Sequence, residues 1–276
     1  SSVFSLSPLQ TEDPLVGSQF IHFILNNMKL LALGAGKDVG RSCILVELGS
    51  SKKYIVMFDA GMHMGFQDER KFPDFRRLPS ERPIDVLIIS HFHLDHSGAL
   101  PHFTERVGYS GPLLMTWPTK AIVPAMLEDF RKIQVERKGD KDFFTSEQIA
   151  ACMKKVTVMN TREVLQLCGG EMQVRVWYGS HVLGAGVWEV TAGGETVVYT
   201  GDYNMTPDRH LGAAGPPMGL KPDLLITEST YCKTIRDSRK SREREFLGRV
   251  HECVARRQSS PSCVCLGSST RVDVDA

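Results

Sequence analysis

The segment HFHLDH, residues 91–96, contains three of the nine histidines of the chain together with an aspartate. It follows the apolar run DVLIIS at residues 85–90, which is typical of a buried strand. Side-chain alternation places His91 and His93 on the same side, while residues 94–96 begin a turn into a helix. Clustered imidazoles with a carboxylate suit zinc or a similar divalent ion, so the segment predicts a metal site.

Further candidate ligands follow other apolar runs. Asp59 ends the run YIVMFD, Asp202 follows TVVYTG, and His181 lies among small residues in YGSHVLGAG. Taken singly, each aspartate is more often a helix cap or a turn residue than a ligand. Their shared position at strand ends favours a common site at one edge of a sheet.

The rest of the chain alternates strand-like and helical patterns. Short apolar runs predict strands at residues 29–33, 42–48, 54–59, 85–90, 172–178, 187–190, 196–202 and 223–229. Helical spacing of apolar residues predicts helices at residues 118–133 and 241–255. The chain is therefore expected to be α/β or α+β, with two sheets that position the candidate ligands.

Composition limits the classes of protein that fit. The chain has 276 residues, of which 42% are hydrophobic and 24% charged, as in an ordinary globular protein with a buried core. The net charge of +1 argues against a protein that coats nucleic acid with a wholly basic surface, although it allows a local basic groove. The seven cysteines are scattered, so they do not suggest a disulfide framework. They are instead typical of a protein in a reducing compartment. We read no membrane span and no export signal.

Beyond single residues, the motifs HFHLDH, FDAGMH, SHVLGA, TGDYN and ITEST resemble the β-CASP branch of the metallo-β-lactamase fold, whose members cut nucleic acids. The motifs LGAGKDVGRSCILV, GMHMGF, LEDFRKI, FFTS, CMKKV and GDYNMTPDRHLGAA are similar to a family of RNA endonucleases. That family includes the catalytic subunit 11 of the Integrator complex and the related mRNA 3′-end cleavage endonuclease. The similarity runs from about Met28 to about Val254. It implies an αββα sandwich with a two-zinc site at one edge of the sheets.

The resemblance also implies a role for each candidate residue. The expected ligands are His91, His93 and His181 for one zinc, Asp95 and His96 for the other, and Asp202 between the two. Asp59 is expected to orient the site by hydrogen bonding, and Glu228 to support a histidine that protonates the leaving oxygen. Because that histidine is missing from this chain, Glu228 fits a surface or helix-terminal carboxylate equally well. Asp59, Asp95, Asp202 and Glu228 are thus the candidate catalytic carboxylates.

The implied function is zinc-dependent RNA endonuclease activity, with phosphodiester hydrolysis by a hydroxide that bridges two metals. The implied process is nuclear RNA 3′-end processing, including that of small nuclear RNA, as part of the Integrator complex. The implied location is the nucleus, with the cytoplasm as the alternative location. The implied partners are RNA and a paralogous β-CASP subunit resembling Integrator subunit 9. Two alternatives stay open: a small-molecule hydrolase of the same fold, and a protein that binds metal and partner without catalysis.

The resemblance predicts four segments. They are a disordered extension at residues 1–27, a metallo-β-lactamase domain at 28–231, the first helix of a β-CASP region at 232–255 and a divergent tail at 256–276. Because the resemblance stops abruptly after Val254, we expect a frameshift, a splice variant or a gene-model error. The sandwich would then be incomplete at its C-terminus, and the second zinc would lack a ligand.

Two local features leave alternatives. Residues 233–257 hold nine Lys or Arg against four Asp or Glu, which fits either a solvated helix face with i,i+4 charge pairs or a phosphate-contacting surface. The sequence YGSH departs from the Ala-Gly that the family usually has before this histidine. That departure is expected to tilt His181 slightly.

Overall fold

The computed structural model describes the chain in segments. They are residues 9–12, 19–25, 27–36, 39–79, 82–137, 143–216, 219–235 and 237–255. Contacts divide the chain into two units, residues 1–228 and residues 229–276.

The first unit contains two β-sheets. The eight-stranded sheet has the order β1 (Leu9–Glu12), β2 (Gln19–Leu25), β3 (Met28–Gly34), β4 (Cys43–Leu48), β5 (Tyr54–Phe58), β6 (Val86–Ile88), β7 (Leu113–Thr116) and β8 (Val156–Met159). Its strands pair antiparallel from β1 to β5 and parallel from β5 to β8. The five-stranded sheet has the order β13 (Leu224–Ile226), β12 (Glu195–Tyr199), β11 (Ala185–Ala192), β10 (Met172–Ser180) and β9 (Val164–Leu167). In this sheet β12 and β13 pair parallel and the other neighbours antiparallel.

Helices connect the parallel strands of the larger sheet. They are α1 (Leu94–Ser97), α2 (Leu100–His102), α3 (Trp117–Lys132) and α4 (Ser146–Lys154). Short helical turns occur at η1 (Glu69–Lys71), η2 (Phe75–Arg77), η3 (Phe103–Val107), η4 (Ile133–Arg137) and η5 (Cys168–Gly170). In α4, Thr145 accepts the Gln148 amide and Gln148 accepts the Thr145 amide, which forms a capping box that fixes the start of the helix.

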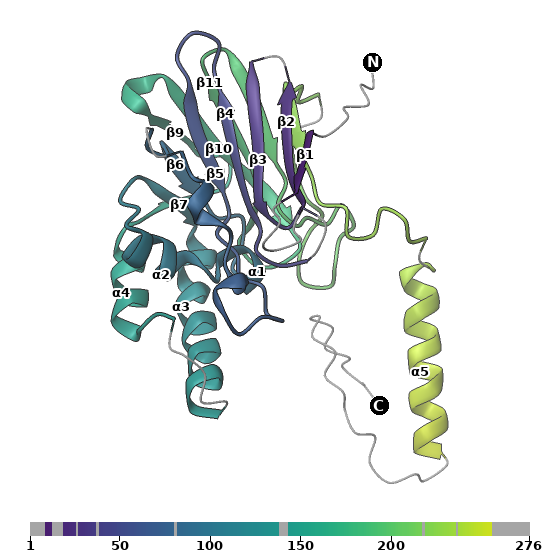
Figure 1. The fold of residues 1–276 in the computed structure, drawn as a ribbon. Helices are drawn as coiled ribbons and strands as arrows, with labels where there is room; N and C mark the ends of the chain where they lie inside the picture. The colour runs from purple at the N-terminus through teal and green to yellow at the C-terminus, as the bar shows by residue number, and fades with distance from the viewer. Residues whose placement is uncertain are drawn as a thin grey trace. The chain divides into compact units, whose positions relative to one another are not determined.

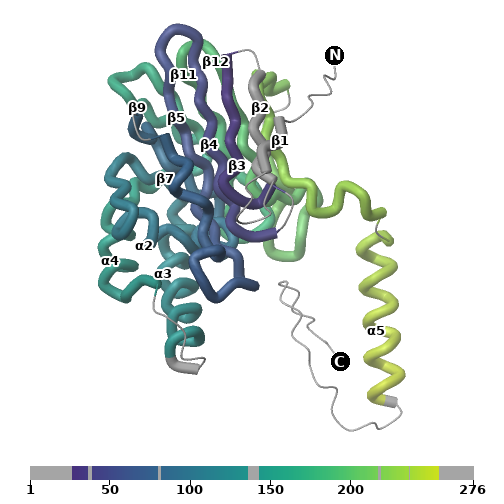
Figure 2. Tube along the Cα trace, viewed as in Figure 1, coloured from purple at the N-terminus to yellow at the C-terminus, as the bar shows by residue number. Residues whose placement is uncertain are grey.

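The apolar residues of the first unit form two cores, one on each side of the eight-stranded sheet. Between the two sheets, Phe58 and Val56 pack in one cluster with Trp188 of the smaller sheet. On the other side, Met57 packs in one cluster with Leu127 of α3. The result is a layer of helices, a sheet and a second sheet, which Figures 1 and 2 show in ribbon and tube form.

This arrangement confirms the predicted fold class, a metallo-β-lactamase sandwich of two sheets flanked by helices. The outer face of the five-stranded sheet carries the half-buried side chains of Arg175, Trp177 and Glu189. Within the described part of the first unit, the helices that pack in the apolar cores lie against the larger sheet. The second helical layer of a full αββα sandwich is therefore not formed by these residues.

Every strand and helix predicted from periodicity is present, with ends that differ by a few residues. The sequence patterns missed β7, β8, β9 and α4. The three strands have only four residues each, and LLMT in β7 is buried throughout, so no alternation marks it. Strands β7 and β8 lie in the parallel part of the larger sheet, where neighbouring strands specify a short strand and a local pattern cannot reveal it. Strand β9 is an antiparallel edge strand of the smaller sheet without a fully buried residue.

The N-terminal stretch differs from its prediction. Residues 1–27 were expected to be disordered, but β1 and β2 pair as antiparallel strands and β2 pairs with β3. The prediction is wrong for residues 9–12 and 19–25, because pairing along the edge of β3 orders a segment that has no hydrophobic period of its own. The other residues before Asn27 and the tail at 256–276 lie outside the described residues, and the domain boundaries stay predictions.

The second unit contains α5 (Arg239–Ala255), which matches the predicted helix. Arg239 pairs with Glu243 at 2.8 Å and Arg249 pairs with Glu245 at 2.6 Å, both at i,i+4 spacing. The predicted charge pairs along this helix are thus confirmed, whereas contact with phosphate stays a prediction. A helix long and apolar enough to cross a membrane does not occur among the described residues.

Candidate metal centre

The candidate ligands lie at one edge of the sandwich because several strands end there. Strands β5 and β6 are parallel neighbours, so Asp59 and His91, which follow their carboxyl ends, reach the same edge. In the smaller sheet β10 and β12 both pair antiparallel with β11 and therefore run in the same direction. Their ends deliver His181 and Asp202. The common strand-end position predicted from the sequence is confirmed.

Close backbone contacts hold the segment after His91 against the loop after β5. The Ala60 amide donates to the His96 carbonyl at 2.9 Å, and the Met62 amide donates to the Leu94 carbonyl at 2.8 Å. A Cβ atom at Gly61 would lie 1.6 Å from the Asp95 carbonyl oxygen, so only glycine allows this approach. The loop therefore fixes the start of α1 and, with it, the positions of Asp95 and His96.

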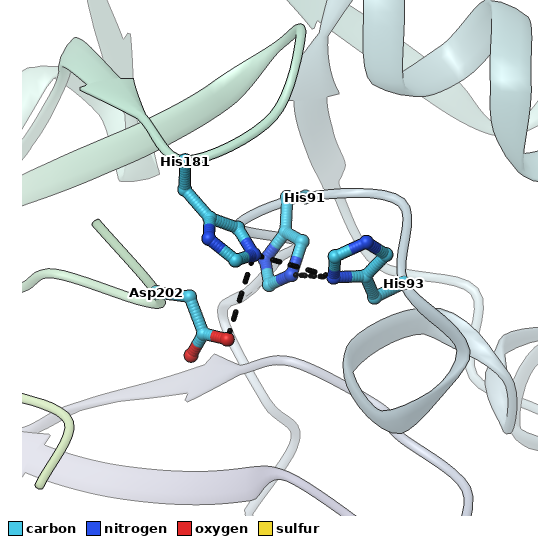
Figure 3. Close-up of side chains that lie close together, drawn as sticks. All are labelled: His91, His93, His181 and Asp202. Atoms are coloured by element: carbon cyan, nitrogen blue, oxygen red, sulfur yellow. Dashed lines mark hydrogen bonds and ion pairs between the residues drawn. The ribbon is translucent and has the colours of Figure 1, made fainter. Parts of the chain in front are cut away.

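Four side chains form what we call the first ligand group: His91, His93, His181 and Asp202. Their ligand atoms all lie within 4.8 Å of one another, and Figure 3 shows the rings turned toward a common point. The Nε2 atom of His91 is 2.9 Å from Nδ1 of His93, which in turn is 3.3 Å from Nε2 of His181. Nε2 of His181 is 3.6 Å from Oδ2 of Asp202. Tetrahedral coordination at about 2.0–2.1 Å places ligand atoms roughly 3.3–3.4 Å apart, so these spacings suit one metal ion.

The histidines of the first ligand group are held neutral by their surroundings. Burial lowers the pKa of His91 well below its usual value, and the neighbouring imidazoles lower it further. Burial likewise lowers the pKa of His93 and of His181. A neutral imidazole keeps a lone pair for a cation, so this group needs little proton release to bind a metal at neutral pH.

The second ligand group consists of Asp95, His96 and Asp202. Nε2 of His96 lies 3.6 Å from Oδ2 of Asp95 and 3.4 Å from Oδ1 of Asp202. Because Oδ2 of Asp202 faces His181, the two oxygens of this carboxylate point to different ligand groups. Burial raises the pKa of Asp202 to about 6, although His96 opposes this shift. Asp202 is therefore largely ionised at neutral pH and lies between the two groups.

Asp59 accepts several hydrogen bonds next to His96 of the second ligand group. Its side chain is fully buried and accepts hydrogen bonds from the Ser90 amide at 2.7 Å, the Ser90 hydroxyl at 3.0 Å and the Tyr199 hydroxyl at 2.6 Å. It also lies 2.7 Å from Nδ1 of His96. Burial opposes a charge on His96, but the carboxylate of Asp59, together with those of Asp95 and Asp202, outweighs it and raises the pKa of His96 to about 9. Asp59 thus fixes the ring of His96 with Nε2 facing Asp95 and Asp202.

Sequence reasoning missed several members of this network, among them Ser90 and Tyr199. Burial raises the pKa of the Tyr199 phenol well above its usual value, and the Asp59 carboxylate adds to the effect, so the hydroxyl stays protonated and donates. The signal available in the sequence was their position: Ser90 precedes His91, and Tyr199 ends the strand that leads to Asp202. Buried polar residues at the ends of ligand-bearing strands are natural outer-shell partners.

Glu228 and Ser180 lie at the margin of the centre. Oε1 of Glu228 accepts the Tyr203 amide at 3.2 Å, which ties β13 to the loop after Asp202, and its catalytic role stays a prediction. Ser180 is fully buried, has a φ of 63°, and its hydroxyl has no hydrogen-bond partner among the described residues. His181 follows with a φ of 35°. Ser180 thus costs stability through its backbone conformation and its buried hydroxyl. Although the expected Ala-Gly is replaced here, His181 is part of the first ligand group.

Three imidazoles and a carboxylate that converge on one point form a ligand set that suits a divalent transition metal. The sequence pattern of the metallo-beta-lactamase superfamily matches residues 36–229, which include both ligand groups. This chain belongs to the metallo-β-lactamase superfamily.

Within this superfamily, the chain is similar in sequence to proteins named as subunits of the Integrator complex and of the cleavage and polyadenylation specificity factor. Over 234 residues the chain is 55% identical to the Integrator complex subunit 11 of Danio rerio, covering 83% of this chain and 38% of that protein. It is 54% identical over 231 residues to the Dictyostelium discoideum homolog of that subunit, covering 82% and 30%. The cleavage and polyadenylation specificity factor subunit 3-II of Arabidopsis thaliana is 49% identical over 229 residues, covering 82% and 36%. The chain therefore spans less than two fifths of each of these relatives, and the resemblance predicted from its motifs is confirmed.

Proposed function

We propose that this chain is the metal-binding domain of a zinc-dependent RNA endonuclease that acts in nuclear RNA 3′-end processing. The observation that carries the proposal is the convergence of His91, His93, His181 and Asp202 in a chain that is 55% identical to a protein named Integrator complex subunit 11. The processing of small nuclear RNA, a paralogous β-CASP subunit as partner and a nuclear location belong to the same proposal. They rest on the names of the relatives.

The chemistry of the site fits phosphodiester hydrolysis. Bound zinc would lower the pKa of a coordinated water to about 7 and neutralise charge that develops on the phosphate. The first ligand group would hold one ion, and Asp95 with His96 would contribute to a second, with Asp202 facing both. Asp59 would keep His96 oriented. The second ion has fewer protein ligands, so we expect it to bind more weakly than the first.

Metal content and RNA cleavage test the proposal together. The H91A/H93A double variant removes two imidazoles of the first ligand group and should lose the tightly bound zinc, measured by elemental mass spectrometry. His210→Ala, which changes an exposed histidine outside both groups, is the matched control and should retain the metal. Equal zinc content in parent and double variant would contradict the site assignment.

The substrate class is tested separately. The zinc-loaded parent should cut a single-stranded RNA only slowly, because the second ion has fewer protein ligands, and the double variant should not cut it. The same preparations should leave thioester and lactam substrates intact. Turnover of those small molecules without RNA cleavage would assign the chain to the small-molecule hydrolases of this fold, and zinc binding without any turnover would make it a binding domain.

A further inference from the structure

Two large apolar side chains are exposed beside the metal centre. Trp117 is 61% exposed and Leu183 is 56% exposed. The other two tryptophans differ: Trp188 is fully buried between the sheets, and Trp177 is half-buried with its Nε1 atom donating to Glu189. Single exposed apolar residues are common on protein surfaces, so the position of this pair matters more than its exposure.

The position of Trp117 follows from sheet topology. Strand β7 pairs parallel with β6, so its carboxyl end reaches the edge at which His91 follows β6. Trp117 comes directly after β7 and begins α3. The strand ends at this edge thus provide Asp59, His91 and, at the next strand along, Trp117.

The loop that follows His181 is fastened to the same point. The hydroxyls of Thr116 and Thr119 lie 2.5 Å and 3.1 Å from the Gly184 carbonyl oxygen and donate to it. Gly184 has a φ of +90°, and a Cβ atom there would lie 2.9 Å from Cβ of Pro118. Residues on both sides of Trp117 therefore contact the neighbour of Leu183. Trp117 and Leu183 therefore lie on neighbouring segments, and Leu183 is two residues from His181 along the chain.

We propose that Trp117 and Leu183 form a stacking surface for a nucleobase of a single-stranded RNA whose phosphodiester is held at the metal centre. The inference rests on the proposed function and names a binding element for it. An indole offers a flat π-face on which any base can stack, which suits sequence-tolerant binding of single strands. When a phosphate of the RNA is bound by the ligand groups, the bases on either side of it lie near the surface formed by Trp117 and Leu183. The threonine bonds to Gly184 hold the surface in place before RNA binds.

Intrinsic fluorescence provides a direct test, because a stacked base quenches an indole. The probes are a short oligoadenylate and an abasic sugar–phosphate chain of equal length, added to the zinc-loaded protein. Oligoadenylate should quench the parent, and the abasic chain should not. Trp117→Phe should abolish this quenching while it retains most of the affinity, and Trp117→Ala should weaken RNA binding by about 5- to 150-fold.

Trp177→Phe is the matched control, because it removes a partly exposed indole from another face and should preserve both quenching and affinity. Unchanged RNA affinity in Trp117→Ala, or equal quenching by the abasic chain, would overturn the inference. Cleavage of RNA by the same parent would then leave the proposed function intact. A parent that fails to bind or cut RNA would refute both. Loss of self-association in Trp117→Ala with unchanged RNA affinity would assign the surface to a protein contact instead.

Discussion

The two ligand groups contain the same kind of side chain in opposite protonation states. In the first ligand group, burial lowers the pKa of His91, His93 and His181, so their imidazoles are neutral and open to a cation. In the second, Asp59, with help from Asp95 and Asp202, raises the pKa of His96 to about 9, so without metal this ring is a positively charged imidazolium. Desolvation acts on all four rings, and only the ring with a buried carboxylate at hydrogen-bonding distance escapes it. The first group is ready for metal, whereas the second must release a proton.

The carboxylates Asp202 and Asp59 provide the largest contrast. Asp202→Ala removes both carboxylate oxygens, of which Oδ1 faces His96 and Oδ2 faces His181. The change should therefore reduce metal binding at both ligand groups. Asp59→Asn retains the shape of a side chain that contacts one expected ligand, His96, and such outer-shell changes typically cost 10- to 100-fold in metal affinity or activity. Competition with a chromogenic chelator ranks the two variants. An equal or reversed order would remove Asp202 from its position between the groups.

The protonation of His96 should appear in the stability of the metal-free protein. Its pKa is raised from 6.5 to about 9, so its contribution to stability is complete below pH 6.5 and is lost as the pH rises through 9. The shift corresponds to about 3 kcal/mol of unfolding free energy. Asp202, with a pKa raised to about 6, titrates below this window.

Urea unfolding in the presence of a chelator, between pH 7.5 and pH 10, measures this loss. Deprotonation of buried Cys43 and Tyr199 would weaken the fold in the same direction, because burial raises the pKa of each. His96→Gln is therefore the reference, and it should show a flatter pH dependence than the parent. Parallel curves for the two proteins would mean that His96 is not protonated in the folded metal-free state.

The sequence was sufficient to predict the parts of the fold and site that local pattern encodes. The run HFHLDH predicted a metal site from sequence alone, because the end of one strand and the start of the next helix bring its residues together without contacts from distant segments. The same applies to β10, whose alternation matches the buried and half-buried positions from Met172 to Val176. Patterns of period 2 report directly which residues face the inter-sheet core.

The remaining features depend on contacts between segments far apart in the chain. Tyr199 reaches Asp59 across 140 residues, and Thr116 reaches Gly184 across 68. No spacing rule links such pairs, so neither the outer-shell tyrosine nor the exposed Trp117 could be placed from the sequence. The strands β1 and β2 are a similar case, because their order depends on an available edge at β3.

Ser180 offers the smallest test, and it concerns the backbone directly before His181 of the first ligand group. Its φ of 63° is costly for a residue with a Cβ atom, and its buried hydroxyl has no partner among the described residues. Ser180→Gly should therefore stabilise the metal-free protein by about 1 kcal/mol, after the greater chain entropy of glycine is subtracted. Ser180→Ala removes the hydroxyl and retains the strained backbone, so the difference between the two variants isolates the backbone contribution. Urea unfolding measures both, and zinc content should stay at the parent value because His181 keeps its place. A loss of stability in Ser180→Gly would indicate that the hydroxyl has a partner, such as an ordered water, that offsets the strain.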